Sequence, residues 1–233
     1  MKLSRNFTNK VNWILDNVIP PFIRDSKLFS FPLIWVFFGK NTKMFMSFKN
    51  KVPQLNHEDI VEYYKKLGKA HIDRETDLNT DCVNYVLNNI SGNSILDIAC
   101  GRGYLAKKIV ERHGLNVIGI DFVIDDLLTN SQNPKFIEGN VESIPFPDKY
   151  FDTVICAHTL EHVVDIQKCI TELRRVCKGQ LIIVLPKQRS YKYTFDLHIH
   201  FFPYQFTVLN LFKNINSKCY CIKNDWVYHE TVE

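Results

Sequence analysis

Five short, almost continuously apolar runs, separated by amphipathic segments, constrain the fold of this chain more than any other feature. The runs occupy residues 94–99, 116–121, 135–139, 152–157 and 180–185. Unbroken apolar runs of this length are typical of strands buried on both faces of a parallel sheet. The segments between them predict helices at 104–113, 124–130 and 164–177. Such strand–helix repeats predict an α/β fold with a doubly wound, mostly parallel sheet.

The flanking segments complete the predicted fold. Helices are expected at residues 58–69 and 77–90, with Asn56 and Thr76 as their N-caps. Two β-rich pieces at 217–223 and 225–231 bring the predicted sheet to seven strands. The 233 residues suit one such domain with a small appendage.

The formal charge of +4 is divided unevenly along the chain. Residues 1–53 carry nine lysines and arginines against Asp16 and Asp25, a charge of +7, which leaves −3 for the rest. Ten of the 30 aromatic residues also lie in this segment. We therefore expect a basic, aromatic-rich N-terminal extension, largely helical, over residues 1–56 and a separate domain over 57–233.

Three roles for the extension remain open: a lid over the site of the domain, a contact in a homodimer, or contact with an anionic membrane or a polyanionic substrate. Trp13, Trp35, Phe37 and Phe38 beside Lys40 and Lys43 suit the membrane role. Binding to nucleic acid is not expected, because no basic helix face or RNA-binding motif is present.

Cysteine usage and hydropathy indicate the compartment. The seven cysteines are scattered, and none forms a Cys-x-x-Cys pair. This pattern suits a reducing compartment and argues against a disulfide framework or a zinc site, so no metal is expected. No apolar run reaches the roughly 18 residues of a membrane span, and the amino terminus lacks a secretory pattern. We expect a cytoplasmic protein, with the inner face of the membrane as the site of any peripheral contact.

The first predicted strand leads directly into Asp97-Ile-Ala-Cys-Gly101-Arg-Gly103. Two glycines there allow a tight turn and a close approach of backbone to a ligand at a helix amino terminus. This pattern, with Asp121 ending the next strand, also matches a dinucleotide fingerprint, so an NAD-linked oxidoreductase is an alternative. The carboxylate of Asp97 would repel a pyrophosphate, however, and it favours a cationic ligand such as S-adenosylmethionine.

At this point the sequence resembles the class I S-adenosylmethionine-dependent methyltransferases, and the type 11 methyltransferases in particular. The similarity covers residues 95–103, 117–121, 139–152, 156–162 and 174–185, in the order that the family has them. The resemblance implies a Rossmann-like methyltransferase fold and S-adenosyl-L-methionine as cofactor. The extension also faintly resembles the leading segment of methyltransferases encoded among bacterial surface-polysaccharide genes, which suggests a role in polysaccharide biosynthesis.

The resemblance assigns residues to the cofactor. Asp97, Gly101 and Gly103 would surround its amino-acid end, with Ala99 at a position where the family often has glycine. Asp121 would accept hydrogen bonds from the ribose hydroxyls. Asn140, where the family commonly has aspartate, would face the adenine amino group. The remaining residues that we assign to the cofactor are Phe122, Val141 and His158.

Methyl transfer requires mainly alignment of the nucleophile and exclusion of water. A hydroxyl or protonated amine acceptor also benefits from a general base, and histidine is suited to this near neutral pH. The candidates are His158, His162 and His200, with His198 as a further one. We expect transfer to a small-molecule or carbohydrate-like acceptor, at oxygen rather than carbon. A non-catalytic binding protein that keeps the fold is the other alternative.

Overall fold

The computed structural model describes residues 5–55, 59–60, 62–63, 75–193 and 196–232, with side chains from residue 10 onward. The chain divides into two compact units. The first unit contains Met1–Arg74 and Gln188–Phe201, and the second contains Glu75–Lys187 and Phe202–Glu233. Among the described residues, no helix is long and apolar enough to cross a membrane.

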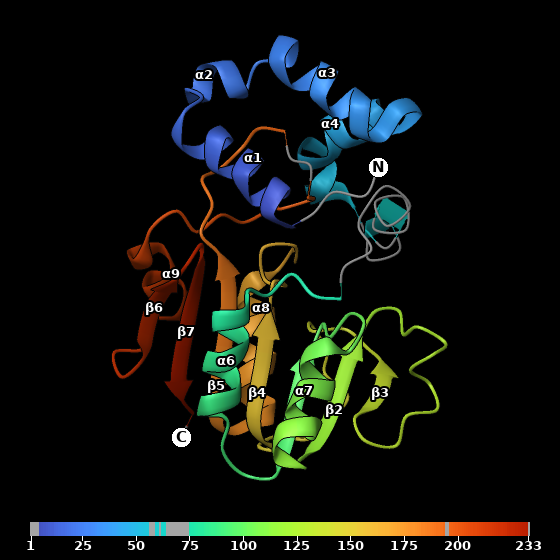
Figure 1. Cartoon of the computed structure of the whole chain (residues 1–233), viewed down its shortest axis with the longest axis vertical. Helices are drawn as coiled ribbons and strands as arrows, with labels where there is room; N and C mark the ends of the chain where they lie inside the picture. The colour runs from blue at the N-terminus through green and yellow to red at the C-terminus, as the bar shows by residue number, and fades with distance from the viewer. Residues whose placement is uncertain (1–4, 56–58, 61, 64–74, 194–195, 233) are drawn as a thin grey trace. The chain divides into compact units, whose positions relative to one another are not determined.

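The second unit is built on a seven-stranded sheet of order β3-β2-β1-β4-β5-β7-β6 (Figure 1). The strands are β1 (Ser94–Ile98), β2 (Asn116–Asp121), β3 (Lys135–Glu138), β4 (Phe151–Ala157), β5 (Cys177–Pro186), β6 (Lys218–Ile222) and β7 (Asp225–Thr231). Strands β3, β2, β1, β4 and β5 are parallel, whereas β7 is antiparallel to both of its neighbours. The predicted doubly wound, mostly parallel seven-stranded sheet is confirmed.

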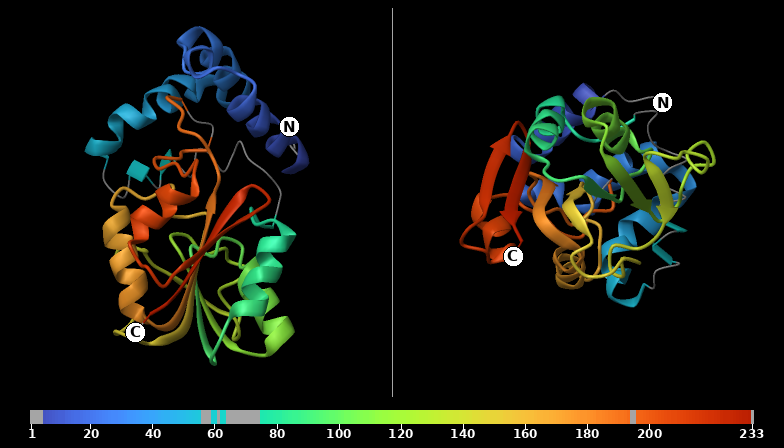
Figure 2. Two further views of the ribbon diagram at one scale, coloured as in Figure 1. Left: turned by 90° about the vertical axis from the view of Figure 1, so that its left-hand side faces the viewer. Right: turned by 90° about the horizontal axis from the view of Figure 1, so that it is seen from below.

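Helices cover both faces of this sheet (Figure 2). Helices α6 (Thr80–Asn89) and α7 (Tyr104–His113) pack on one face, and α8 (Ile166–Val176) and α9 (Gln205–Phe212) on the other. Each face of the sheet has its own hydrophobic core, and strand β5 contributes to both. Its residues Leu181, Ile183 and Leu185 pack in the core with α8. Ile182 and Val184 pack in the core with α6. The alternation explains why the sequence of this strand is apolar without interruption.

The helix predicted at residues 124–130 is wrong, because this segment forms consecutive turns. Asp125 Oδ1 accepts a hydrogen bond from Leu127 N at 3.0 Å, and Thr129 Oγ1 donates to Asp126 O at 2.8 Å. Short polar side chains that bond to the nearby backbone compete with the helical hydrogen-bond pattern. Strands β2 and β3 are consequently joined by irregular chain.

The N-cap predicted for α6 is also wrong. The helix begins at Thr80, and Asn79 caps it by accepting from Cys82 N at 2.9 Å. Thr76 lies in the preceding turn, where its hydroxyl accepts from Leu78 N. The helix predicted at 58–69 and its cap at Asn56 lie largely outside the described residues.

Residues 5–55 of the first unit are mainly helical. The helices are α1 (Arg5–Asn17), α2 (Pro21–Arg24), α3 (Lys27–Phe38) and α4 (Thr42–Lys51), with 3₁₀ turns at Gly39–Asn41 and Val52–Gln54. Its core joins α3 and α4 through Phe38 and Phe45, whose rings stack with centroids 3.9 Å apart. Tyr193 and Leu197, from the later segment Gln188–Phe201, complete the same core.

A buried arginine, Arg24, ties that later segment to the helices. Its Nη1 donates to Leu15 O at 3.3 Å, and its Nη2 donates to Ser190 O at 2.5 Å. The guanidinium also lies over the Tyr191 ring, 4.3 Å from the centroid. The compact units therefore divide the chain differently from the predicted 1–56 and 57–233, because the core of the first unit includes Tyr193 and Leu197 from the later segment.

Two glycines that flank α7 allow the packing at its start to be tested. Gly103 (φ +71°) precedes the helix, and an added Cβ would lie 2.4 Å from Cζ of the buried Phe136. Gly114 (φ +66°) follows the helix, and its Cβ would meet nothing within 4 Å. Alanine is strained at both positions by about 1–2 kcal/mol.

We expect Gly103→Ala to lower the free energy of unfolding by about 1–3 kcal/mol more than Gly114→Ala does, since only the former overpacks the core. Urea unfolding of both variants measures the difference. Equal losses would show that the packing of Phe136 does not require a glycine at 103.

Candidate active site

The predicted cofactor residues converge at one edge of the sheet in the second unit. Asp97 lies on β1, Asp121 ends β2, and His158 directly follows β4. These three strands are parallel neighbours, so their carboxyl ends lie side by side. This is the edge at which open α/β sheets bind ligands.

The loop between β1 and α7 has an unusual backbone. Ala99, Gly101 and Gly103 all have positive φ, at 56°, 54° and 71°. Cys100 N donates to Ile120 O at 3.0 Å and Gly103 N donates to Cys100 O at 2.9 Å, which holds the loop against β2. A Cβ on Gly101 would meet nothing within 4 Å, so this side of the loop borders open space. Ala99 adopts a conformation that glycine adopts without strain.

Asp97 is buried at 3% exposure, and its Oδ2 has no hydrogen-bond partner among the described residues. Burial raises the pKa of this carboxyl to about 7; the Ala106 backbone N–H partly opposes the shift, and the charge of Asp121 adds to it. Buried polar atoms are normally paired. The orphaned oxygen therefore fits a ligand that brings a positively charged N–H donor.

Asp121 connects β2 to the glycine loop. Its Oδ2 accepts a hydrogen bond from Gly101 N at 2.7 Å. Burial raises the pKa of this carboxyl, while the backbone N–H groups of Gly101, Val123 and Phe122 lower it. Asp121 thus holds Gly101 in place and meets the backbone of Phe122, which brings three of the predicted cofactor residues together.

Asn140 and Val141 follow β3 in a tight turn. Asn140 Oδ1 accepts from Glu142 N at 2.8 Å, and Asn140 O accepts from Ser143 N at 3.0 Å. Val141 is buried in the core that also contains Ile144. The turn fixes the amide of Asn140 and uses one lone pair of its oxygen, so its predicted contact with adenine rests on the remaining one.

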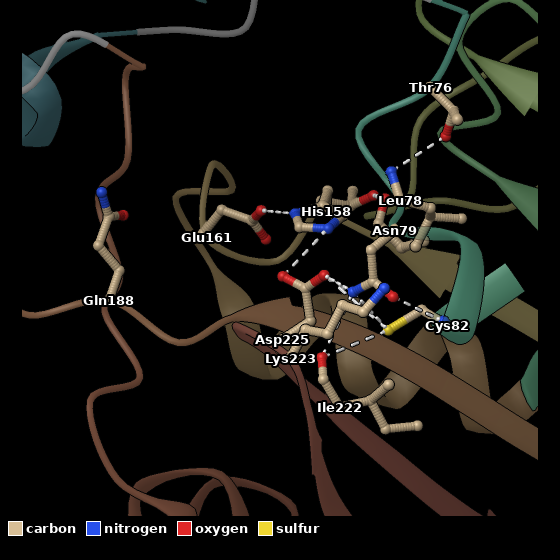
Figure 3. A network of polar contacts seen from close by, with 12 residues as sticks. Thr76, Leu78, Asn79, Cys82, His158, Glu161, Gln188, Ile222, Lys223 and Asp225 are labelled. Atoms are coloured by element: carbon tan, nitrogen blue, oxygen red, sulfur yellow. Dashed lines mark hydrogen bonds and ion pairs between the residues drawn. The ribbon is translucent and has the colours of Figure 1, made fainter. Parts of the chain in front are cut away.

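His158 lies between two carboxylates (Figure 3). Its Nδ1 is 3.4 Å from Glu161 Oε1, and its Nε2 is 3.6 Å from Asp225 Oδ1 at the start of β7. Asp225 Oδ2 in turn accepts from Asn79 Nδ2, the cap of α6, at 2.7 Å. Burial disfavours the charged ring, but the bonds to Asp225 and Glu161 outweigh it and raise the pKa of His158 to about 10.

The role of His158 as a general base stays a prediction, and its environment favours the protonated ring. The nearby carboxylates raise the pKa of the ring, which favours the imidazolium, and each ring nitrogen lies near one of them. An imidazolium has no free lone pair to accept a proton. His158 also connects the end of β4 to β7 and α6.

The other candidate bases lie in two places. His162 is in the turn after β4, with Nε2 3.8 Å from Glu161 Oε1. His198 and His200 lie in the segment of the first unit, where His198 Nδ1 is 2.5 Å from Gln188 Oε1. The role of His162 and His200 as bases stays a prediction.

Asp225 and Asn79 are site residues that the sequence did not reveal. The Asn79-Thr80 pair carried a usable signal, since asparagine before a helix is a favoured N-cap. Nothing in the sequence indicated the role of Asp225, because its contact with His158 joins residues 67 positions apart.

Comparison with known proteins supports the fold and the class of the domain. Residues 96–185 match a family model described as a methyltransferase domain. The 2-phytyl-1,4-naphtoquinone methyltransferase of Trichormus variabilis is 36% identical over 98 residues, which are 37% of this chain and 43% of the relative. The ubiquinone/menaquinone biosynthesis C-methyltransferase UbiE of Hahella chejuensis is 33% identical over 107 residues, 40% of this chain and 43% of the relative.

The chain thus spans less than half of the length of these curated relatives. A solved structure, that of PH0226 from Pyrococcus horikoshii, superposes with a TM-score of 0.55 at 19% identity. It covers 74% of this chain and 99% of the other, and it shows that the fold is shared.

The family match falls on β1 through β5, which include Asp97 and Asp121 and the strand that His158 directly follows. The matching family and the fold imply S-adenosylmethionine as the methyl donor. On these grounds the chain carries a domain of the class I S-adenosylmethionine-dependent methyltransferases.

Proposed function

We propose that this protein transfers a methyl group from S-adenosylmethionine to a small-molecule acceptor. The observation that carries the proposal is the buried Asp97 Oδ2, which lacks a donor and lies beside a glycine loop that borders open space. A ligand with an ammonium group would supply that donor, and S-adenosylmethionine has one.

The residues that would hold the cofactor have distinct tasks. Asp97 would bind its ammonium group, Gly101 would allow its close approach, and Asp121 would accept from its ribose hydroxyls. Asn140 and Val141 would contact its adenine, with Ala99, Phe122 and His158 nearby. Bound S-adenosylmethionine supplies a methyl group already activated by a sulfonium, so the protein needs mainly to align the acceptor and exclude water.

The acceptor has two candidates. From the sequence we propose methylation at oxygen of a carbohydrate-like molecule, as in polysaccharide biosynthesis, with His162 or His200 taking the proton. The relatives favour a second candidate: one is named for a phytyl naphtoquinone and another for C-methylation in ubiquinone and menaquinone biosynthesis. Methylation at carbon of a quinone-like acceptor would follow from this similarity.

Two other functions fit the site less well. An NAD-linked oxidoreductase would place a pyrophosphate near the buried Asp97, which carries a full or partial negative charge at neutral pH. A binding protein without catalysis fits the fold but has no observation of its own in its favour. A cytoplasmic location and a homodimer through residues 1–56 stay proposals.

Calorimetric titration with S-adenosylmethionine, S-adenosylhomocysteine and NAD tests the function. We expect the first two to bind and NAD not to bind. Asp121→Ala and Gly101→Ala should weaken cofactor binding by at least about tenfold, because the first removes a charged acceptor and the second fills the open side of the loop.

Gly114→Ala is the matched control for Gly101→Ala, because it has the same backbone strain but lies at the other end of α7. It should bind the cofactor as the unaltered protein does. Transfer of an isotope-labelled methyl group to candidate acceptors then identifies the product, since the NMR chemical shift separates methyl on oxygen from methyl on carbon. Tight binding of NAD alone would refute the proposed function.

Asp97→Asn should separate stability from binding. The pKa of Asp97 is raised from 3.8 to about 7 on folding, so its ionisation costs stability. That cost is absent below about pH 4, grows as the pH rises, and is complete above about pH 7. Without cofactor, Asp97→Asn should therefore be more stable than the unaltered protein at about pH 8 and equally stable at about pH 4. Urea unfolding at both pH values measures this.

The same variant should bind S-adenosylmethionine about 10–100-fold more weakly, because a hydrogen bond to a charged group is lost. A stability difference that does not change with pH would contradict the assigned pKa.

A further inference from the structure

Helix α3 of the first unit is apolar around its whole circumference. Ten of its 12 residues are apolar, and the exceptions are Lys27 and Ser30. One face, formed by Ser30, Ile34 and Phe38 at a spacing of four, is buried in the core of the unit. A helix that is apolar on all sides is normally buried on all sides.

The opposite face of α3 is nevertheless exposed. Leu28, Phe31 and Trp35 follow one another at helical spacing along it, and Leu28 is 88% exposed. Val36 lies beside them and is exposed as well. Patches of this kind on a folded protein mark a surface that something else covers.

Helices α1 and α2 add to this apolar surface. Phe22 is 78% exposed, and the other large apolar side chains exposed on these helices are Trp13, Ile14 and Ile23, with Val18 in the turn between them. Arg24 holds the helices together, because it bonds to Leu15 O of α1 and its own carbonyl accepts from Ser30 Oγ of α3. Nine large apolar side chains are thus exposed within residues 13–36.

The charges beside this surface are positive. Lys27 begins α3, Lys40 and Lys43 follow its end, and all three are exposed. The acidic residues of this segment, Asp16 and Asp25, are both used inside the unit. Asp16 accepts from Tyr191 Oη at 2.8 Å, and Asp25 accepts from Lys192 N at 3.0 Å.

We propose that helices α1–α3 bind the surface of an anionic lipid bilayer. Their exposed apolar side chains enter the boundary between head groups and acyl chains, and Lys27, Lys40 and Lys43 contact the phosphates. At 12 residues α3 is roughly 18 Å long, too short for a hydrocarbon core of about 30 Å, so it lies in the plane of the interface. Exposed tryptophans next to lysines suit this depth.

The positive charge selects the bilayer over a second copy of this chain. The cores of protein interfaces are depleted in lysine, and two copies would bring these lysines toward each other. An anionic surface gains from each of them. The proposal does not depend on the proposed methyl transfer, because lipid binding is measured without cofactor or acceptor.

Co-sedimentation of the full chain with vesicles tests the proposal. We expect binding to phosphatidylcholine vesicles that contain phosphatidylserine, weakened by salt, and much weaker binding to phosphatidylcholine alone. Replacing Phe22, Leu28 and Trp35 together by serine should weaken binding by at least about 100-fold. The matched control replaces Leu127, Phe206 and Ile215 of the second unit by serine. These are also exposed apolar residues, and their replacement should leave vesicle binding unchanged.

A second pair of variants tests the charge. Lys27→Gln with Lys40→Gln and Lys43→Gln should weaken binding to anionic vesicles by on the order of 100-fold. Lys107→Gln with Lys135→Gln and Lys218→Gln, at exposed positions of the second unit, should weaken it far less. A far-UV circular dichroism spectrum and a urea unfolding transition like those of the unaltered protein confirm that each variant is folded.

Absence of vesicle binding, or equal effects of test and control variants, would overturn the proposal. A second result would also overturn it. If sedimentation velocity shows a dimer, and the serine variant alone dissociates that dimer but still binds vesicles, then a second copy of the chain covers the surface.

Discussion

The carboxylate of Asp97 is buried at the end of β1, and the edge of the sheet that we propose binds the cofactor is arranged around it. The amino terminus of α7 faces it through the N–H of Ala106, which offsets part of the cost of burying a charge. Gly103 lets α7 begin close to Phe136 and β3. Asp121 adds a second negative charge a strand away and holds Gly101 by a hydrogen bond. The edge is therefore electrostatically unfavourable by itself and complementary to a cation.

The buried polar network around His158 has a different character. The His158 ring finds its partners within the protein, because it lies between the carboxylates of Glu161 and Asp225. Asn79 extends the network to the start of α6. Buried polar partners of this kind fix geometry, because removing one of them leaves the others buried and uncompensated. The two polar clusters of the second unit thus have different roles. Asp97 has an oxygen that can bind a ligand, whereas His158 and its partners connect the end of β4 to β7 and α6.

The sequence predicted the features that depend on local pattern. The strands of the parallel sheet were placed within a few residues, because strands buried on both faces are apolar without interruption. The helix predicted at 124–130 was wrong. Its apolar spacing suggested a helix, but Asp125 and Thr129 form hydrogen bonds with the backbone of their own turns. The proposed cofactor residues near the glycine loop came from the resemblance to a known family, and their role stays a prediction. The charge state of His158 could not be predicted, since it depends on Asp225, which folding alone brings near.

The same limit applies to the division of the chain. Composition separated a basic segment at the amino terminus but could not show that Tyr193 and Leu197 belong to its core. Such pairings between distant residues depend on tertiary packing and leave no periodic trace in the sequence. The exposed apolar face of α3 was equally hidden, because the helix is apolar on every side.

The segment Gln188–Phe201 gives the protein an order of assembly. During synthesis the helices of residues 5–55 leave the ribosome before the segment Gln188–Phe201. Arg24 can therefore complete its hydrogen bonds only after Ser190, 166 positions later, has been synthesised. Contacts of such separation form late, after the loop between them has been closed. Until then the apolar helices lack part of their core and are exposed to association with other chains. Chaperones bind chains that expose apolar surface in this way. A fragment that ends before residue 188 would lack Tyr193 and Leu197 and would remain prone to association.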